Sequence, residues 1–211
     1  MSGNSSDRPL ASIYEAGSEA ALEAEYDNWA DKYDADTAAG GYRLPFLVSG
    51  FVARHIPATD AAILDAGAGT GLAGDGLSVL GYRNITGIDL SQKMLDRAAT
   101  LDAYASLEHM TLGEALAFDS DSFDGVISTG VFTEGHAPPS SFDELLRVTR
   151  PVGHIIFTVR DSVYLDKGFK EKLEALQADG AWKLIEQTAA VRAYTAGEAH
   201  IRCIFFVYQV L

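Results

Sequence analysis

Residues 63–71, with the sequence ILDAGAGTG, constrain the fold of this chain most strongly. The apolar start predicts a buried β-strand, and the three glycines that follow predict a tight turn into a helix. Glycines at such a turn allow positive φ angles and let a ligand approach the backbone closely. Because ordinary strand-to-helix turns share this pattern, other parts of the chain must indicate whether a ligand binds here.

Strand-like and helix-like segments alternate after this turn. Such alternation predicts a parallel sheet with helices on both faces. Two strand-like runs, residues 182–194 and 201–210, close the chain with only a short loop between them, so we expect them to pair antiparallel. The other predicted strands are residues 84–89, 109–112, 123–128 and 154–159, and the predicted helices are residues 71–80, a helix capped by Ser91, 141–150 before Pro151, and 167–178.

Two helices are predicted ahead of the glycine turn, over residues 18–39 and 42–55. The first has Ser18 as a suitable N-cap. Its apolar stripe at helical spacing contains Leu22, Tyr26, Trp29 and Tyr33. This stripe predicts either a lid over a ligand or simple packing on the main domain. Three acidic residues lie outside the stripe and are expected to face water: Asp27, Asp31 and Asp34.

Charge and composition limit the partners. The chain has 30 acidic and 16 basic residues, a net charge of −14, which would repel nucleic acid and anionic membranes. The single cysteine, Cys203, excludes an intramolecular disulfide and a cysteine-based metal site, and the histidines form no metal-binding pattern. No apolar segment approaches the length of a membrane span. We therefore expect a cytoplasmic protein without metal, nucleic-acid or membrane partners; the oligomeric state stays open.

The expected domain organisation is simple. Residues 1–17 show no strong periodicity of apolar residues, so we expect a flexible N-terminus. Residues 18–211 predict a single domain, in which residues 18–57 form a helical lid and residues 58–211 form a Rossmann-like core.

Polar or glycine residues follow four consecutive predicted strands. Asp65 closes the first strand, Asp89 closes the second, Glu114 follows the third and residues 128–130 end the fourth. The carboxyl ends of parallel strands meet at one edge of the sheet, where ligands bind. A carboxylate at Asp89 suits the two vicinal hydroxyls of a ribose. The pattern therefore predicts a site for a nucleoside-type ligand.

A nicotinamide dinucleotide is one candidate ligand, because residues 69–74 also match GxGxxG. Three features count against it. Asp65 would be unfavourable beside a pyrophosphate but suits a cationic ligand, and the turn contains no Arg or Lys. The chain also ends in an antiparallel pair of strands instead of a second mononucleotide-binding half.

The motifs DAGAGTG, GIDLSQKML, SFDGVIS and DELLRVTRPVGHIIFT, in this order, resemble those of class I S-adenosylmethionine-dependent methyltransferases. More narrowly, ILDAGAGTGLAG with ISTGVFTEGHAP is similar to the methyltransferase-like proteins of the Williams–Beuren region group. The resemblance covers about residues 26–161. It implies a doubly wound α/β sheet of seven strands in the order 3-2-1-4-5-7-6, with only strand 7 antiparallel. Residues 151–153, PVG, depart from the usual PGG at a turn away from the cofactor.

The resemblance also implies the cofactor S-adenosylmethionine, its product S-adenosylhomocysteine, and contacts to them. Met94 has an alternative role as a core residue, since it lies on the apolar face of its helix. The implied cofactor-binding residues are Asp65, Ala66, Gly67, Gly69 and Thr129 toward the methionine part, Asp89 toward the ribose, Leu90, Met94, Glu114 and Ala115 toward the adenine, and Tyr33 as a cover.

A sulfonium is already an activated leaving group, so the enzyme need mainly align the acceptor in line and exclude water. His136 is placed to orient the acceptor or to act as a base, or it is a structural loop histidine. Tyr26 and Trp29 would join it on the acceptor side as part of the lid. A small-molecule acceptor is expected, because residues 128–133 lack the Asn/Asp-Pro-Pro-Tyr/Phe motif of nucleic-acid amine methyltransferases. The alternatives are a degenerate cofactor-binding or interaction module and an NAD(P)-dependent oxidoreductase.

Overall fold

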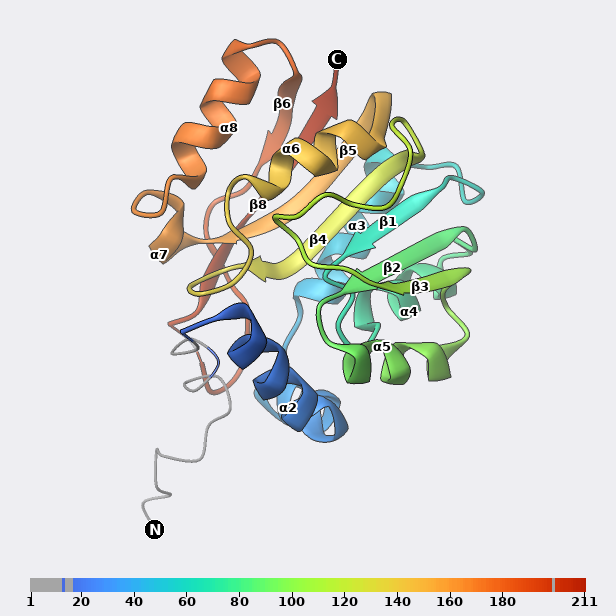
Figure 1. Ribbon diagram of the computed structural model, residues 1–211, viewed down its shortest axis with the longest axis vertical. Helices are drawn as coiled ribbons and strands as arrows, with labels where there is room; N and C mark the ends of the chain where they lie inside the picture. Colours follow the sequence, from blue (N-terminus) through green and yellow to red (C-terminus); the bar gives the residue numbers. More distant parts are fainter. Residues whose placement is uncertain (1–12, 14–16, 199) are drawn as a thin grey trace.

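The structure is a computed structural model that describes residue 13, residues 17–198 and residues 200–211. The predicted flexibility of residues 1–17 therefore falls almost wholly outside the described residues. Within the described part, a twisted sheet carries helices on both faces, and a further helix lies beyond one end of the sheet (Figure 1). No helix in these ranges has both the length and the apolar character needed to cross a bilayer.

The sheet confirms the predicted topology. Across the described ranges it has eight strands in the order β3-β2-β1-β4-β5-β8-β6, with the short β7 paired to β8. Neighbours from β3 to β5 pair in parallel, and β8 runs antiparallel to β5 and β6. The strands are β1 Ile63–Ala66, β2 Ile85–Asp89, β3 Ser106–His109, β4 Phe123–Phe132, β5 Thr149–Arg160, β6 Trp182–Gln187, β7 Val191–Arg192 and β8 Arg202–Val210.

The eighth strand arises because residues 182–194, predicted as one strand, form two. Both β6 and β7 pair with β8, but residues 188–190 between them leave the ladder. Thr188 stays attached there, because its backbone N–H donates to the carbonyl of Phe205 at 3.0 Å. The long β8 thus acts as the common partner, and it takes the place of the predicted seventh strand.

Several predicted boundaries differ from the structure; the fourth strand, for example, continues to Phe132 instead of ending at residues 128–130. The third strand lies at Ser106–His109 instead of residues 109–112. The predicted helix over residues 141–150 ends at Val148, and Pro151 lies inside β5. Pairing between β4 and β5 shifts register there, and Val152 has a φ of 65°. A proline is tolerated at such an irregularity because no ladder hydrogen bond is required from it.

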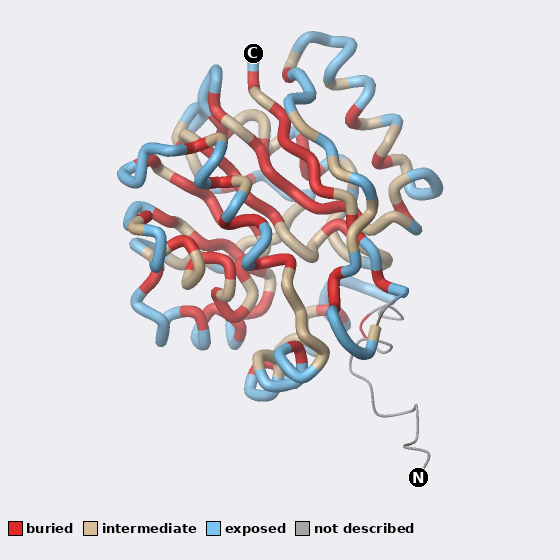
Figure 2. Tube along the Cα trace, turned by 180° about the vertical axis from the view of Figure 1, so that it is seen from behind, coloured by how far each residue is buried: buried red, intermediate tan, exposed pale blue. Residues whose placement is uncertain are grey.

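Helices cover the sheet because its strands are apolar on both faces. Neighbouring residues Ile155 and Ile156 on β5 are fully buried in different clusters, as alternation across a strand requires. Helices α6, α7 and α8 pack on one face, and α3 and α4 on the other; Figure 2 shows the buried strands between exposed helical surfaces. The helices are α2 Glu19–Gly40, α3 Leu44–His55, α4 Leu72–Val79, α5 Gln92–Ala98, α6 Ser141–Val148, α7 Asp161–Tyr164 and α8 Phe169–Ala178, with a 3-10 turn η1 at Ala99–Leu101.

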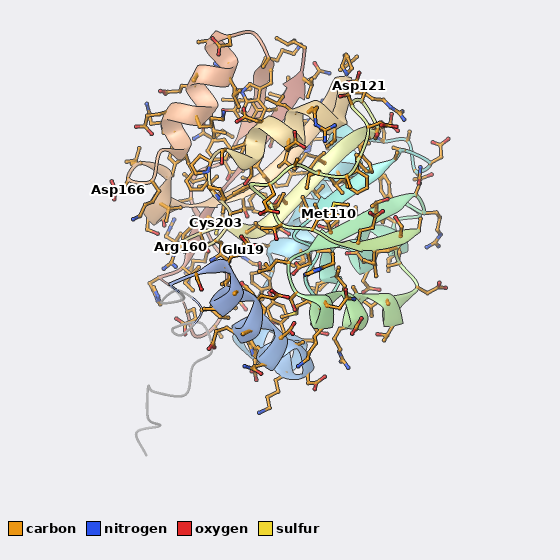
Figure 3. All side chains as sticks on the ribbon, in the orientation of Figure 1. Glu19, Met110, Asp121, Arg160, Asp166 and Cys203 are labelled. Atoms are coloured by element: carbon orange, nitrogen blue, oxygen red, sulfur yellow. The ribbon has the colours of Figure 1, made fainter. Side chains whose placement is uncertain are left out.

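Helix α2 lies beyond the carboxyl ends of the strands (Figure 1). Ser18 is its N-cap, as predicted, with Oγ accepting from the backbone N–H of Ala21 at 3.2 Å. Figure 3 shows Glu19 and Arg160 at this end of the sheet and Asp121 at the opposite end. This arrangement brings one helix over the loops that follow β1 to β4.

Candidate functional site

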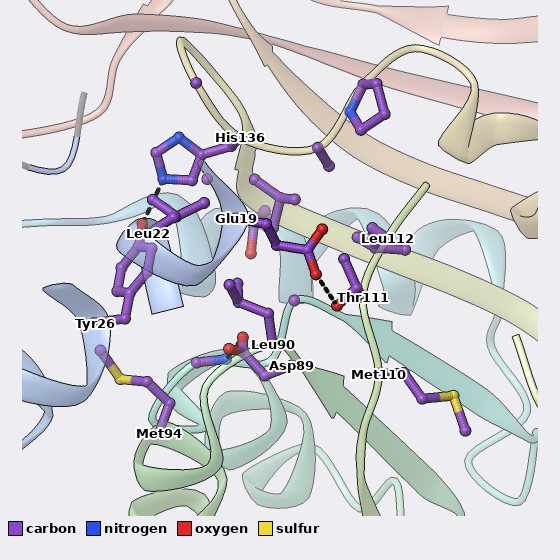
Figure 4. Close-up of a pocket in the computed structure, with 18 of the residues that line it drawn as sticks. Glu19, Leu22, Tyr26, Asp89, Leu90, Met94, Met110, Thr111, Leu112 and His136 are labelled. Carbon is purple, nitrogen blue, oxygen red and sulfur yellow. Dashed lines mark hydrogen bonds between the residues drawn. The ribbon is translucent and has the colours of Figure 1, made fainter. Parts of the chain in front are cut away.

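A cavity of about 300 Å³ lies between α2 and these loops (Figure 4). Its position outside the carboxyl ends of parallel strands is where α/β sheets bind ligands, and its volume suits a small-molecule site. The wall contains Tyr26 and Tyr33 from α2, Met94 from α5, Thr129 from β4, and, from the strand ends and loops, Gly67, Gly69, Asp89, Leu90 and His136. Other predicted site residues lie elsewhere: Trp29 lines a smaller adjoining cavity, and Asp65, Ala66, Glu114 and Ala115 line neither.

Asp89 joins the ends of the first two strands. Its Oδ2 accepts from the backbone N–H of Gly69 at 2.8 Å, and its Oδ1 accepts from the N–H of Ser91 at 2.9 Å. Burial raises the pKa of this carboxyl, whereas these hydrogen bonds lower it. Each carboxylate oxygen has a second lone pair, so Asp89 can still accept from a ligand in the cavity.

The glycine turn presents its backbone to the cavity. Gly67 has a φ of 88°, and a Cβ there would lie 2.2 Å from Val131 Cγ2, so close packing on the end of β4 requires a glycine. Gly69 has a φ of 55°, and a Cβ there would meet nothing within 4 Å. The backbone at Gly69 therefore borders open space beside Asp89, as a ligand cradle requires.

Asp65, which was expected to meet the methionine part of the cofactor, lies beneath this turn and does not line the cavity. Its Oδ2 accepts from the Tyr104 hydroxyl at 2.7 Å, and its Oδ1 has no hydrogen-bond partner among the described residues. Burial raises the pKa of Asp65 to about 7; the Tyr104 bond lowers it, and nearby Asp89 raises it. Tyr104, from the segment before β3, is thus the hydrogen-bond partner of this buried carboxylate. Ala66 is also fully buried, within the core.

The segment after β3 contributes different residues from those predicted. Met110, Thr111 and Leu112 line the cavity, whereas Glu114 and Ala115 are exposed. Because β3 ends at His109, the residues that immediately follow the strand reach the cavity, and an isolated bridge between Leu112 and Glu114 ends this stretch. A correct strand boundary would have been enough to identify them.

Side chains of α2 bind to the loop after each of the first three strands. Asp34 accepts from Thr70 Oγ1 at 2.6 Å, Asp27 accepts from Ser91 Oγ at 2.6 Å, and Glu19 accepts from Thr111 Oγ1 at 2.8 Å. The expectation that Asp27 and Asp34 face water was therefore wrong, because both carboxylates hold α2 to the sheet. Only Asp31 of the predicted trio is exposed.

Tyr26 binds the loop after β4. Its hydroxyl lies 2.7 Å from His136 Nε2, while His136 Nδ1 lies 2.8 Å from the carbonyl of Glu134 and 2.9 Å from Thr133 Oγ1. Burial lowers the pKa of His136; the Glu134 carbonyl and carboxylate raise it, and Arg160 lowers it. The histidine thus makes the backbone bond of a structural residue and also presents a nitrogen at the cavity wall (Figure 4).

In the described part of the chain, no group of three or more His, Cys, Asp or Glu side chains is placed to hold a metal ion.

Sequence comparisons agree with this architecture. The family described as methyltransferase domain matches residues 64–157. Human methyltransferase-like protein 27 is 35% identical over 179 residues, which cover 82% of this chain and 72% of the human protein. Demethylmenaquinone methyltransferase of Clavibacter sepedonicus is 30% identical over 144 residues, covering 65% of this chain and 58% of that protein.

Solved structures share the fold. The cyclase SpnF superposes with a TM-score of 0.72 at 17% identity, covering 92% of this chain and 97% of SpnF. A TehB-like S-adenosylmethionine-dependent methyltransferase from Corynebacterium glutamicum gives a TM-score of 0.63 at 22% identity, covering 89% and 99%. At these identities the likeness shows the fold alone. The family assignment rests on the similarity to the human protein, the ordered motifs and the strand order. The chain belongs to the class I S-adenosylmethionine-dependent methyltransferases, and S-adenosylmethionine is its cofactor.

Proposed function

We propose that this enzyme transfers the methyl group to a small-molecule acceptor by in-line displacement. The observation that carries the proposal is the cavity, which α2 covers and whose charged wall residues, within the described part of the chain, are Glu19 and Asp89 without any Lys or Arg. An acceptor held through phosphates would require cationic side chains. A compact acceptor that enters between α2 and the strand ends requires none.

The residues of the wall fit the cofactor. Asp89 would accept from the ribose hydroxyls, because both carboxylate oxygens are already oriented by backbone N–H groups. Leu90 and Met94 would lie against the adenine, and the open backbone at Gly69 would face the methionine part near Thr129. We propose that Asp65 acts from beneath, by holding Tyr104, whose hydroxyl accepts from the backbone N–H of Gly74 in the first turn of α4.

S-adenosylmethionine supplies a methyl group on a sulfonium, which is an activated leaving group. The protein then has to exclude water, align the acceptor and, for some acceptors, accept a proton. Helix α2, with Tyr33 in the wall, would close the cavity. His136 is the candidate that orients the acceptor or takes its proton, since its pKa is lowered and the neutral imidazole is the form that can accept.

Partners other than the acceptor, the domain division and the location of the protein are matters of prediction. The absence of a nucleic-acid partner stays a prediction; an 18S rRNA (guanine-N(7))-methyltransferase from mouse is 42% identical over 66 residues, or 31% of this chain. The single domain of residues 18–211, its division into a lid and a core at residue 57, the absence of a membrane partner and the cytoplasmic location also stay predictions.

The test is to incubate the enzyme with S-adenosylmethionine carrying a labelled methyl group and three acceptor pools: a small-metabolite extract, total RNA and denatured protein. We expect label in the metabolite extract. The Asp89→Ala variant should lose this labelling because it loses the ribose contact. Asp166→Ala removes an exposed carboxylate far from the cavity and should retain it. Label confined to RNA or protein would contradict the proposal.

A further inference from the structure

The Tyr26–His136 pair stands between two cavities. Both residues line the main cavity and also a smaller one of about 40 Å³, which we call the aromatic subsite. The aromatic subsite is lined by Tyr26, Trp29, Tyr33, Tyr42, Tyr194 and His136, among others. Among its described lining residues none is Asp, Glu, Lys or Arg. An acceptor reaching from the main cavity into this subsite therefore meets uncharged, mostly aromatic surface.

Hydrogen bonds assign the proton positions within the pair. The carbonyl of Glu134 can only accept, so His136 Nδ1, 2.8 Å away, carries a hydrogen. In the neutral imidazole Nε2 is then the acceptor, and the Tyr26 hydroxyl 2.7 Å away donates to it. A phenolic oxygen that donates its proton can still accept one. The Tyr26 oxygen can therefore take a proton from a bound acceptor while it gives its own proton to His136.

The charged groups beside His136 compensate one another. The Glu134 carboxylate accepts from Arg160 Nη1 at 2.7 Å and from Ser162 Oγ at 2.6 Å. An imidazolium formed at His136 would keep its bond to the Glu134 carbonyl and would lie close to this carboxylate. Among the described residues, the charged groups that act on the histidine are Glu134 and Arg160, and their effects on its pKa are opposite.

We propose that Tyr26 is the residue that takes the proton of the acceptor and passes its own proton to His136, and that the acceptor is a neutral aromatic hydroxyl, a phenol. This inference rests on the proposed transfer to a small molecule and adds a proton route and an acceptor class. A tyrosine hydroxyl and a phenol are the same functional group, so a proton can be shared between them at little cost.

The step balances in atoms and charge. The acceptor oxygen forms a bond to the methyl carbon, and the electron pair of the breaking carbon–sulfur bond stays on sulfur. The acceptor proton goes to Tyr26 Oη, and the Tyr26 proton goes to His136 Nε2. The products are a methyl ether, neutral S-adenosylhomocysteine and an imidazolium, so the positive charge of the sulfonium ends on His136.

Other acceptor classes fit the aromatic subsite less well. A carboxylate or phosphate has no cationic partner among the described residues of either cavity. A protonated amine has no carboxylate partner in the aromatic subsite, and a thioether or tertiary amine has no proton to give. An aromatic hydroxyl, by contrast, can stack on the tyrosine rings and use the proton route.

The test uses two phenols that differ in acidity. An unsubstituted phenol ionises near pH 10 and needs a base, whereas a nitro-substituted phenol is already ionised in weakly alkaline buffer. We expect wild-type enzyme to methylate both, with a higher KM for the ionised nitro-substituted phenol because the described residues of the cavities offer it no cationic partner. Tyr26→Phe should lower kcat/KM for the unsubstituted phenol by about 100-fold or more and leave the nitro-substituted phenol nearly unchanged. His136→Ala should show the same selectivity, and the double variant should lose no more than either single variant. Tyr164→Phe, on α7 away from both cavities, is the matched control.

The outcomes separate this inference from the proposed function. Equal losses for both phenols would indicate a merely structural role for Tyr26 and overturn the proton route. Methylation of amines or thiols but of no phenol would overturn the acceptor class while the proposed small-molecule transfer stands. A wild-type enzyme that methylates no member of a panel of phenols, amines and thiols, yet labels RNA or protein, would overturn both.

Discussion

At the scale of single residues, the most unusual group is the carboxyl of Asp65. It is 1% exposed and hydrogen-bonded through only one oxygen. A buried carboxylate with one satisfied oxygen is costly to ionise, which is why the pKa of Asp65 is raised to about 7. The glycine turn is therefore built over a group that keeps its proton through the mildly acidic range.

This property predicts how stability changes with pH. Between pH 4 and pH 7 the unfolded chain ionises Asp65 while the folded chain retains the proton, so the folded state binds more protons and ionisation of Asp65 lowers stability as pH rises. Asp65→Asn removes this titration. The free energy of unfolding of the variant relative to the wild type should therefore rise across this range, by at most about 1.4 kcal/mol per pH unit.

Urea unfolding without cofactor, at pH values from 4 to 8, measures this difference. A variant in which a half-exposed carboxyl is neutralised instead, Asp75→Asn on α4, serves as the control and should run parallel to the wild type. A constant offset between Asp65→Asn and the wild type would show that Asp65 titrates normally.

Some of the residues that line the cavity could be predicted from the sequence, and others could not. Gly67, Gly69 and Asp89 were placed at the cavity because glycines and a carboxylate at strand ends have few other roles, and they lie in its wall. Asp65 could not be placed, because its direction depends on Tyr104, which lies far along the chain. Glu114 does not line the cavity, and the residues that do could not be identified because the boundary of a short, half-buried strand leaves little signal in a sequence.

At the scale of elements, α2 is bound mainly through polar side chains. Its buried apolar contacts form a small cluster with Leu22 and Trp29 at the centre. Its hydrogen bonds reach the loops after all four of the strands that border the cavity. An element with few apolar contacts opens more easily than a core element. The bonds of Asp27 and Asp34 should therefore control how often the cavity opens.

Asp27→Ala and Asp34→Ala should each weaken the docking of α2 by about 1 kcal/mol, because each removes a hydrogen bond between a hydroxyl and a carboxylate. Amide hydrogen exchange over α2 should become about fivefold faster, and S-adenosylhomocysteine should dissociate faster to a similar extent. Exchange measured by mass spectrometry and stopped-flow dissociation test both effects. Asp31→Ala, on the same helix but exposed, should change neither. Unchanged exchange in all three variants would show that α2 is held by its apolar contacts.

At the scale of the whole molecule, the parallel sheet was predictable from the alternation of strands and helices, and the antiparallel β8 from a short loop. The order of the strands came only from the resemblance to the methyltransferase family. The split between β6 and β7 was not predictable, since residues 188–190 carry no glycine or proline to mark an interruption. The hydrogen bonds of Asp27 and Asp34 on α2 were also not predicted. Helical periodicity indicates which side chains are buried but not which residues elsewhere in the chain they bind.

The complete charge distribution predicts which nucleoside ligands bind. The molecule carries a net charge of −14, and the described wall of the main cavity adds Glu19 and Asp89 without a cation. A pyrophosphate would therefore be repelled, whereas S-adenosylhomocysteine bears no phosphate. At 100 times its Kd, S-adenosylhomocysteine should stabilise the fold by about 2.7 kcal/mol and raise Tm by about 5 to 10 °C. NAD at the same concentration should leave Tm unchanged. Thermal unfolding followed by circular dichroism compares the two ligands. An equal shift with NAD would contradict this reading of the cavity, because the acidic wall would then be no barrier to a dinucleotide.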